Sequence, residues 1–238
     1  VIRMRIDYWL GSSVGRAISC PSSFPTNAQL LVFALRNLSK DDDAAVLSLS
    51  AYAAALRRAL AAPRSIFFID EAPILFEFDQ ISALIARLCA NGAKAGVRVI
   101  LSGQDPDTVY KSPSASKIFQ NLSTRLIGRI QPVAVDSFVR ILKYPLEIIQ
   151  RNAGESFFPK AAGIYSQWLL DHNGVFTFCR YYPAYDQLGA VANNPDEQNA
   201  RTAYLQAYGH PFKAIAQFSR ALVRAIQQGR EIEPPTAP

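Results

Sequence analysis

Two short apolar segments, separated by one helix's length of chain, constrain the fold more than any other feature. Ile66–Ile69 and Val97–Ser102 have the length and the apolar character of buried strands. Between them, Asp79 can begin a helix that runs to about Ala90, and Gly92 can end it. Parallel strands are covered on both faces, and the connections between them are short and right-handed. We therefore expect these two segments to be adjacent parallel strands.

The alternation of strand-like and helical segments extends to both sides. Leu30–Leu35 and Arg125–Ile130 are predicted to be further strands, and Val1–Leu10 is strand-like as well. Ala44–Ala61 and Ser114–Asn121 are predicted to be helices. This order is typical of an α/β fold with a mostly parallel sheet flanked by helices. We expect residues 1–135 to form that core.

The rest of the chain predicts a hairpin and then helices. Ile164–Leu170 and Val175–Tyr181 are strand-like and flank Asn173-Gly174, a sequence typical of two-residue hairpin turns. Asn194, Pro195 and Glu197 then predict the start of a helix that runs to Tyr208, and a last helix is predicted from Pro211 to Gly229. We expect residues 136–229 to form a helical and hairpin extension packed on the core, and residues 230–238 to be a disordered tail.

Composition excludes several classes of protein. Three cysteines and two histidines in 238 residues have neither a disulfide framework nor a zinc-site spacing. The net charge of +6 is spread evenly along the chain, which does not indicate a dedicated nucleic-acid-binding arm. No apolar run reaches the roughly 18 residues that span a bilayer. The chain begins at Val1 without an initiator Met, so we expect it to be a piece of something longer.

The sharpest local feature is the sequence Ile66-Phe67-Phe68-Ile69-Asp70-Glu71. It places two carboxylates just beyond the C-terminal end of a buried strand, where open α/β sheets bind their ligands. In P-loop ATPases, an Asp at this place holds Mg²⁺ and an adjacent Glu polarises the attacking water. The alternative is a strand that ends in solvated acids.

Gln104 follows the next predicted strand through Gly103. A neutral amide at that place can contact a γ-phosphate or its water without adding charge, and so report the nucleotide state to the rest of the fold. Alone it would be an ordinary loop residue. Its position one helix and one strand after Asp70-Glu71 favours an ATPase.

The runs IFFIDEAPILF and CANGAKAGVRVILSGQDP resemble the conjugation and type IV secretion ATPases of the TraC type. These belong to the HerA/FtsK superfamily of RecA-like motors. Upstream, Trp9, Gly11 and Pro21 resemble the stretch between the phosphate loop and the Walker B strand in that family. The likeness covers roughly residues 5–135.

The resemblance implies a RecA-like fold, a homo-oligomer (a hexamer), and ATP with Mg²⁺ as cofactors. It also implies partners in the secretion or conjugation machinery at the cytoplasmic face of the inner membrane, with DNA as a further partner. By position, Asp70 and Glu71 match the Walker B pair, so Asp70 would bind the cofactor and hold Mg²⁺ through water, and Glu71 would be catalytic. Gln104 matches the glutamine after the next strand.

Ring-shaped ATPases also use an arginine that reaches into a neighbouring subunit's site. Arg125 and Arg129 flank the predicted strand after Gln104, near a sheet edge where a neighbour could dock. We take Arg125 as the candidate. The alternative is a surface arginine whose aliphatic stem packs on the protein.

The sequence departs from the family in one decisive respect, because it contains no G-x-x-x-x-G-K-[ST] motif. The nearest match, Gly11–Ala17, is one residue short and lacks the Lys and the hydroxyl. We expect the phosphate loop to lie upstream of Val1. Otherwise the domain is inactive.

Three other functions stay open. The chain could belong to a HerA/FtsK-type DNA translocase, or be a non-catalytic relic that serves as an assembly module. Gly11–Gly15 also matches the G-x-S-x-G elbow of α/β-hydrolases, with Ser13 as nucleophile. Its partners would be Asp171 or Asp186 with His172 or His210, although Asp171-His172 falls in the predicted hairpin turn.

Overall fold

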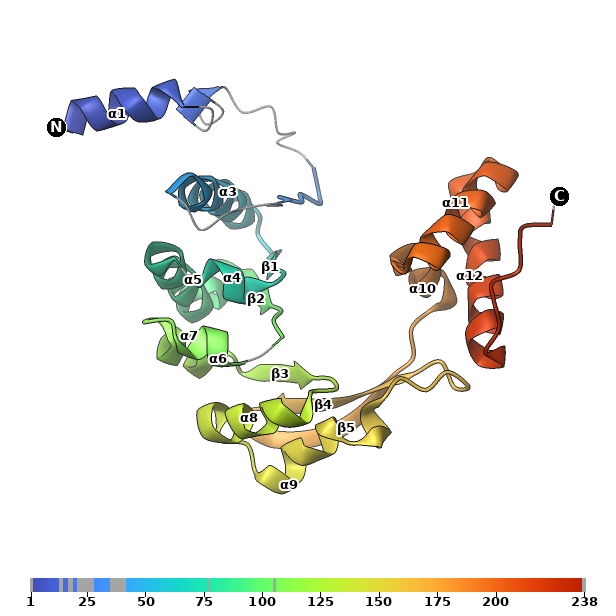
Figure 1. The fold of residues 1–238 in the computed structure, drawn as a ribbon. Helices are drawn as coiled ribbons and strands as arrows, with labels where there is room; N and C mark the ends of the chain where they lie inside the picture. Colours follow the sequence, from blue (N-terminus) through green and yellow to red (C-terminus); the bar gives the residue numbers. More distant parts are fainter. Residues whose placement is uncertain are drawn as a thin grey trace. The chain divides into compact units, whose positions relative to one another are not determined.

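A computed structural model describes residues 2–12, 15–16, 19–20, 28–34, 42–76, 78–104 and 106–236. The chain divides into two compact units, Val1–Leu122 and Ser123–Pro238. Each has its own secondary structure (Figure 1). The first unit contains α1 (Ile2–Gly11), α3 (Asp42–Ala61), β1 (Ser65–Ile69), α4 (Ala72–Leu75), α5 (Asp79–Asn91), η1 (Gly92–Ala95), β2 (Val97–Leu101), α6 (Pro106–Tyr110) and α7 (Ala115–Asn121).

β1 and β2 form a parallel pair, in register from Ser65 opposite Val97 to Ile69 opposite Leu101. This confirms the parallel arrangement expected for the two apolar segments. The helical segment between β1 and β2 ends at Gly96. The φ of this residue is 75°, which favours glycine because it has no side chain. The turn lets the chain re-enter the sheet beside β1.

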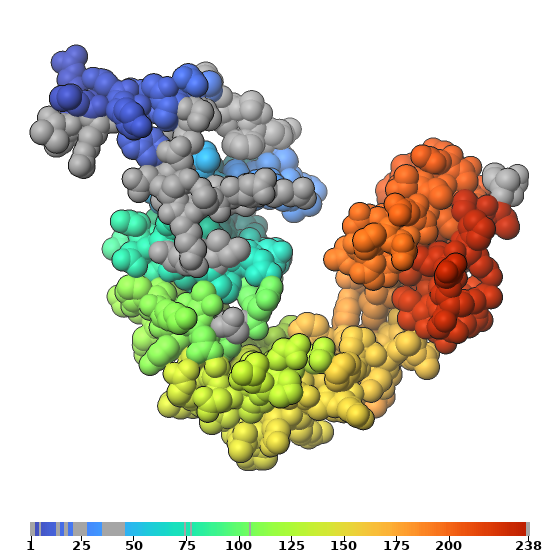
Figure 2. Space-filling model, viewed as in Figure 1, coloured from blue at the N-terminus to red at the C-terminus, as the bar shows by residue number. Residues whose placement is uncertain are grey.

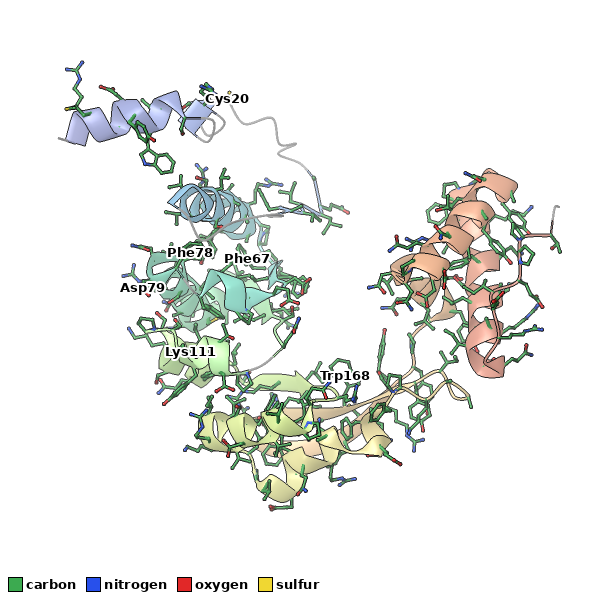
Figure 3. The ribbon with its side chains drawn as sticks, viewed as in Figure 1. Cys20, Phe67, Phe78, Asp79, Lys111 and Trp168 are labelled. Carbon is green, nitrogen blue, oxygen red and sulfur yellow. The ribbon has the colours of Figure 1, made fainter. Side chains whose placement is uncertain are left out.

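One face of this sheet carries the core of the first unit. Phe67, labelled in Figure 3, is buried on β1, and its ring meets the edge of Tyr52 from α3 at 5.4 Å between centroids. Ile81 and Ile85 of α5 are buried in the same cluster. Ile66 and Phe68 alternate with Phe67 along β1, so they lie on the opposite face, where they are exposed. This differs from the expectation that parallel strands are covered on both faces.

Three predicted strands differ in the structure. The first, Val1–Leu10, lies largely in helix α1. Its polar and apolar residues alternate in the sequence, but Arg3 and Asp7 also have helical i,i+4 spacing and form an ion pair at 3.9 Å. The second, Leu30–Leu35, is neither helix nor strand over residues 30–34, and Leu35 lies outside the described residues.

The third difference concerns Arg125–Ile130. Residues Thr124–Ile127 form β3, which pairs antiparallel with β4 in the second unit. Within the described part of the chain, the parallel sheet therefore contains two strands. The chain is α/β, with a small parallel sheet and a separate antiparallel one.

The second unit begins with β3, and not after residue 135 where we expected the extension to start. Its elements are β3 (Thr124–Ile127), η2 (Pro132–Ala134), α8 (Val135–Leu142), α9 (Leu146–Ile149), η3 (Gln150–Ala153), η4 (Glu155–Phe157), β4 (Ser166–His172), β5 (Val175–Tyr181), α10 (Tyr185–Val191), α11 (Pro195–Tyr208) and α12 (Pro211–Gln228).

The strands β3, β4 and β5 form an antiparallel sheet in that order. Asn173 and Gly174 have φ of 52° and 83°, which a type I′ hairpin turn requires, so the predicted hairpin is confirmed. Leu169 on β4 is fully buried with Ile149 of α9. The adjacent Trp168, labelled in Figure 3, belongs to the other face, where its ring lies close to Gly128.

The helices α10, α11 and α12 pack together as one continuous body, coloured orange to red in Figure 2. Its centre is formed by Tyr204, Phe218 and Leu222. The predicted start of α11 is confirmed, because the Glu197 carboxylate accepts the Asn194 backbone N–H at 3.3 Å. Residues 231–236, expected to be disordered, contact α11 through hydrogen bonds described below.

Candidate functional site at the carboxyl edge of the parallel strands

The carboxyl ends of β1 and β2 bring polar side chains from two loops together. Asp70 and Glu71 follow β1, and Ser102 and Gln104 follow β2. Because the strands are parallel and in register, both loops leave the sheet at the same edge. Asp70 and Gln104 therefore emerge at one edge, and side-chain hydrogen bonds join the two loops.

Ser102 connects the two loops through its side chain and its backbone. Its hydroxyl donates to Asp70 Oδ1 and accepts the backbone N–H of Glu71 at 3.2 Å. Its own backbone N–H donates to the Ile69 carbonyl at 3.0 Å, and its carbonyl accepts from Ala72 at 2.9 Å. Ser102 therefore fixes where the carboxylate of Asp70 lies and how the chain turns at Glu71.

Sequence reasoning missed the role of Ser102. We treated it as the last residue of an apolar strand. The available signal was a hydroxyl at the strand's end, directly before Gly103 and Gln104. A polar residue that ends an otherwise apolar strand lies at the edge where ligands of α/β sheets bind.

Glu71 has an unusual backbone and a specific partner. Its φ of 49° and ψ of 42° lie in the left-handed region, which costs a residue with a Cβ about 1 kcal/mol. Its side-chain Oε1 accepts a hydrogen bond of 3.1 Å from Gln104 Nε2. Backbone strain of this kind clusters at functional sites. The pair joins the two residues that the sequence singles out.

Gly103 allows the second loop to approach the first closely. A Cβ at this position would lie 2.9 Å from Cγ and 3.0 Å from Cδ of Pro73, closer than packed atoms tolerate. Pro73 belongs to the short helix α4 that follows Glu71. The absent side chain thus allows the loop carrying Gln104 to lie against the segment that follows Glu71.

The donor set of this site suits one kind of metal ion. Mg²⁺ prefers oxygen ligands, keeps several waters, and binds through one or two carboxylates together with substrate phosphates. Asp70, Glu71 and Ser102 offer oxygens of this type. Within the described ranges, no group of three or more His, Cys, Asp or Glu residues gathers to hold a metal. The oxygens of Asp70, Glu71 and Ser102 are therefore of the kind that would hold a Mg²⁺ bound together with a phosphate.

Arg125 lies in the second unit, within a buried hydrogen-bond network. Its Nη1 forms an ion pair of 2.9 Å with Asp171, whose side chain is 4% exposed. Tyr144 donates its hydroxyl to the same carboxylate at 2.6 Å, and the backbone N–H of Gly174 donates at 2.9 Å. Burial alone would raise the pKa of Asp171, but the hydrogen bonds from Tyr144, Gly174 and Arg125 lower it overall.

The structure also places two other arginines, Arg129 and Arg98. Arg129 stacks over the Phe158 ring at 3.8 Å within the second unit. Arg98 lies on β2 opposite Ile66, on the exposed face of the sheet.

The hydrolase alternative gains no support. Ser13 lies outside the described residues, and the segment before it is the helix α1, where the elbow needs a strand. His172 lies in β4 and not in the turn, with its Nδ1 2.8 Å from the Thr124 hydroxyl. Asp171 is already bonded to Arg125 and Tyr144. Asp186 lies in α10, and His210 precedes α12.

Comparisons with known proteins do not assign a family. No protein-family model matches the sequence, and no curated protein matches it. Among the described residues, no helix is both long enough and apolar enough to cross a membrane.

Proposed function

We propose that this chain is part of an ATP-hydrolysing motor of the conjugation and type IV secretion kind. The single observation that carries the proposal is the hydrogen bond between Glu71 and Gln104 at the carboxyl edge of two parallel strands. Asp70 lies next to this pair and is held by Ser102. An acidic pair and an amide at the ends of adjacent parallel strands suit two of the tasks of nucleotide hydrolysis, which are to hold Mg²⁺ and to position the attacking water.

Each residue has a distinct role in this proposal. Asp70 would hold Mg²⁺ through water, and Ser102 fixes the Asp70 carboxylate by donating its hydroxyl to it. Glu71 accepts a proton from the attacking water, and Gln104 holds Glu71 in place until a γ-phosphate competes for its amide. Bound Mg²⁺ supplies charge stabilisation for the transferred phosphoryl group. Because both carboxylates are exposed, a ligand can reach them from solvent.

The remaining features of a ring motor are part of the proposal. They are a hexameric homo-oligomer, partners in the secretion or conjugation machinery at the cytoplasmic face of the inner membrane, and DNA as a further partner. Arg125 is a weak choice for the arginine that acts across subunits, because its guanidinium is held by Asp171 in its own unit. Arg125→Ala would therefore reduce the stability of the second unit, and any loss of turnover in this variant must be separated from that effect.

A second candidate function is a non-catalytic assembly module. The observation that favours it is the absence of a G-x-x-x-x-G-K-[ST] motif from all 238 residues. Without such a loop, the backbone N–H groups and lysine that hold the phosphates have no counterpart here.

The decisive experiment uses the complete product of the gene that encodes these residues. We would measure ATP binding and steady-state hydrolysis for the parent and for Glu71→Gln. The motor proposal expects nearly unchanged binding and a loss of kcat of roughly 10²-fold or more, because the amide cannot accept the proton. Unchanged turnover in Glu71→Gln would mean that Glu71 is only a solvated loop acid. A gene product that binds no ATP would instead favour the assembly module.

A further inference from the structure

The C-terminal segment 231–236 occupies a face of α11 that carries two tyrosines. Tyr204 donates its hydroxyl to the Glu233 carbonyl at 3.0 Å, and Tyr208 donates to the Thr236 carbonyl at 3.1 Å. The two rings are stacked, with centroids 6.0 Å apart and planes 11° from parallel. Figure 1 shows the deep-red tail folding back beside the helices. The tail is thus held through its main chain, as a bound peptide would be.

The contacts of the tail repeat every three residues. Ile232 and Pro235 are partly buried, whereas Glu233, Pro234 and Thr236 are exposed. Ile232 packs against the core of the α10–α12 body. The two carbonyls that accept hydrogen bonds are also three residues apart. A polyproline II helix has three residues per turn, and consecutive prolines favour it.

The chemistry of this face is that of a proline-recognition surface. Aromatic side chains whose polar groups hydrogen-bond to peptide carbonyls form the grooves that bind polyproline II segments. Tyr204 is buried, and its hydroxyl is a donor at neutral pH because the ordinary pKa of tyrosine is about 10; burial raises that pKa further. Lys213 Nζ lies 5.5 Å from the Tyr208 ring centre. Both tyrosines can serve any chain that presents carbonyls at this spacing.

We propose that the Tyr204–Tyr208 face of α11 is a binding site for extended peptides with the pattern Ile-x-x-Pro, and that residues 231–236 fill it in cis. The partner is a polyproline II segment of another protein that displaces the tail. This inference does not depend on ATP hydrolysis. It adds a protein-recognition site on the second unit, separate from the carboxyl edge of β1 and β2.

The test is a peptide-binding titration with two forms of the chain. The probe is a fluorescein-labelled peptide with the sequence of residues 230–236, REIEPPT. One form is the full chain, and the other ends at Gly229, with its helix content checked by circular dichroism. A tail tethered by so few residues competes at an effective concentration in the millimolar range. We therefore expect the shortened chain to bind the peptide at least about tenfold more tightly.

Variants identify the surface. Tyr204→Phe and Tyr208→Phe keep the rings and remove the donors, so each should weaken peptide binding several-fold. The matched control is Tyr110→Phe in α6 of the first unit, which should change nothing. In the peptide, an Ala at the position of Ile232 or Pro235 should weaken binding. An Ala at the position of Glu231 should leave binding unchanged.

A second variant tests the proposal without relying on the folding of the shortened chain. The full chain carrying Ile232→Ser keeps every helix but loosens its own tail, so it should bind the peptide more tightly than the parent. The proposal is overturned if the shortened and full chains bind equally well. It is also overturned if neither the shortened chain nor the Ile232→Ser chain binds at millimolar peptide.

Discussion

Gln104 Nε2 lies 3.1 Å from Glu71 Oε1, so a single hydrogen bond joins the loop after β2 to the loop after β1. The two residues are 33 positions apart in the sequence. They meet because β1 and β2 run parallel and in register, which brings both carboxyl ends to one edge. Whatever binds Glu71 must therefore also replace or accommodate the amide of Gln104.

The isolated chain of residues 1–238 should bind Mg-ATP very weakly and hydrolyse it at no measurable rate. Phosphate recognition rests on backbone N–H groups and a lysine for which this sequence has no motif. Equilibrium dialysis and a phosphate-release assay check both parts. Steady turnover that Glu71→Gln abolishes would show that the chain carries a phosphate site of another kind.

In the complete gene product, Asp70→Asn should act differently from Glu71→Gln. The amide lowers the charge next to Mg²⁺, so the affinity for nucleotide should fall together with kcat. Titrations at several Mg²⁺ concentrations should show that excess Mg²⁺ partly rescues Asp70→Asn and leaves Glu71→Gln unchanged. Identical Mg²⁺ dependence in the two variants would contradict the separate roles.

Gly103→Ala should separate the two loops. The added methyl group meets the Pro73 ring at 2.9 Å, so the loop or α4 must shift. Overpacking of this size costs about 1–3 kcal/mol of unfolding free energy. Thermal unfolding followed by circular dichroism would measure it. Gly11→Ala is the control, because a Cβ there meets nothing within 4 Å, and its unfolding temperature should be unchanged or slightly higher.

Asp171→Asn should destabilise the second unit in a pH-dependent way. The carboxylate is buried and accepts from Tyr144, Arg125 and Gly174, so removing its charge should cost about 3 kcal/mol at pH 7. The folded state lowers the pKa of Asp171, so its contribution is present above the unfolded value near 3.9 and is lost as pH falls below it. The gap between variant and parent should therefore shrink below about pH 4.

Urea unfolding followed by Trp168 fluorescence would measure this gap at pH 7 and pH 3. The matched control is Asp136→Asn on α8, whose carboxylate is 86% exposed and 3.7 Å from Arg140. That variant should change the unfolding free energy by less than about 0.5 kcal/mol at either pH. A constant gap for Asp171→Asn at both pH values would show that the carboxylate acts through packing alone.

Cys89 should resist alkylation until the first unit opens. Burial raises the pKa of its thiol to about 11, so little thiolate is present at pH 8. Cys20 is exposed and should react with iodoacetamide roughly 10²-fold faster. Mass spectrometry of timed samples would give both rates. Because Cys89 packs on the core beneath β1 and β2, urea should accelerate its reaction selectively.

The sequence predicted those elements whose own residues determine their secondary structure. The apolar runs of β1 and β2, the Asn173-Gly174 turn and the helix-start residues before α11 all carry such signals, and the structure confirms them. Leu30–Leu35 has the same apolar character as β1, yet residues 30–34 join neither sheet. Apolar character shows that a segment avoids water, but not what it packs against.

The pairing of β3 could not be read from the sequence. Its short sequence, Thr124–Ile127, fits a strand in either direction, and its partner β4 begins far along the chain. The role of Ser102 could not be predicted either, because its hydroxyl contacts Asp70, 32 positions away in the sequence, only after β1 and β2 have paired. Arg125 was expected to face a neighbouring subunit, but the charge that binds it is Asp171 on β4, in its own unit.

The connection between β1 and β2 also has a consequence for the order of folding. The β4–β5 hairpin closes through two residues and can form within about 1–10 μs. The bond from Ser102 to Asp70 joins residues 32 positions apart, so it forms only after the intervening chain, which includes α5, has brought β2 back beside β1. During synthesis, a ribosome must release β2 before Asp70 finds its partner. The carboxylate edge thus forms only after β2 has been released, and a nascent chain halted before Val97 would contain both acids without the contacts that hold them in place.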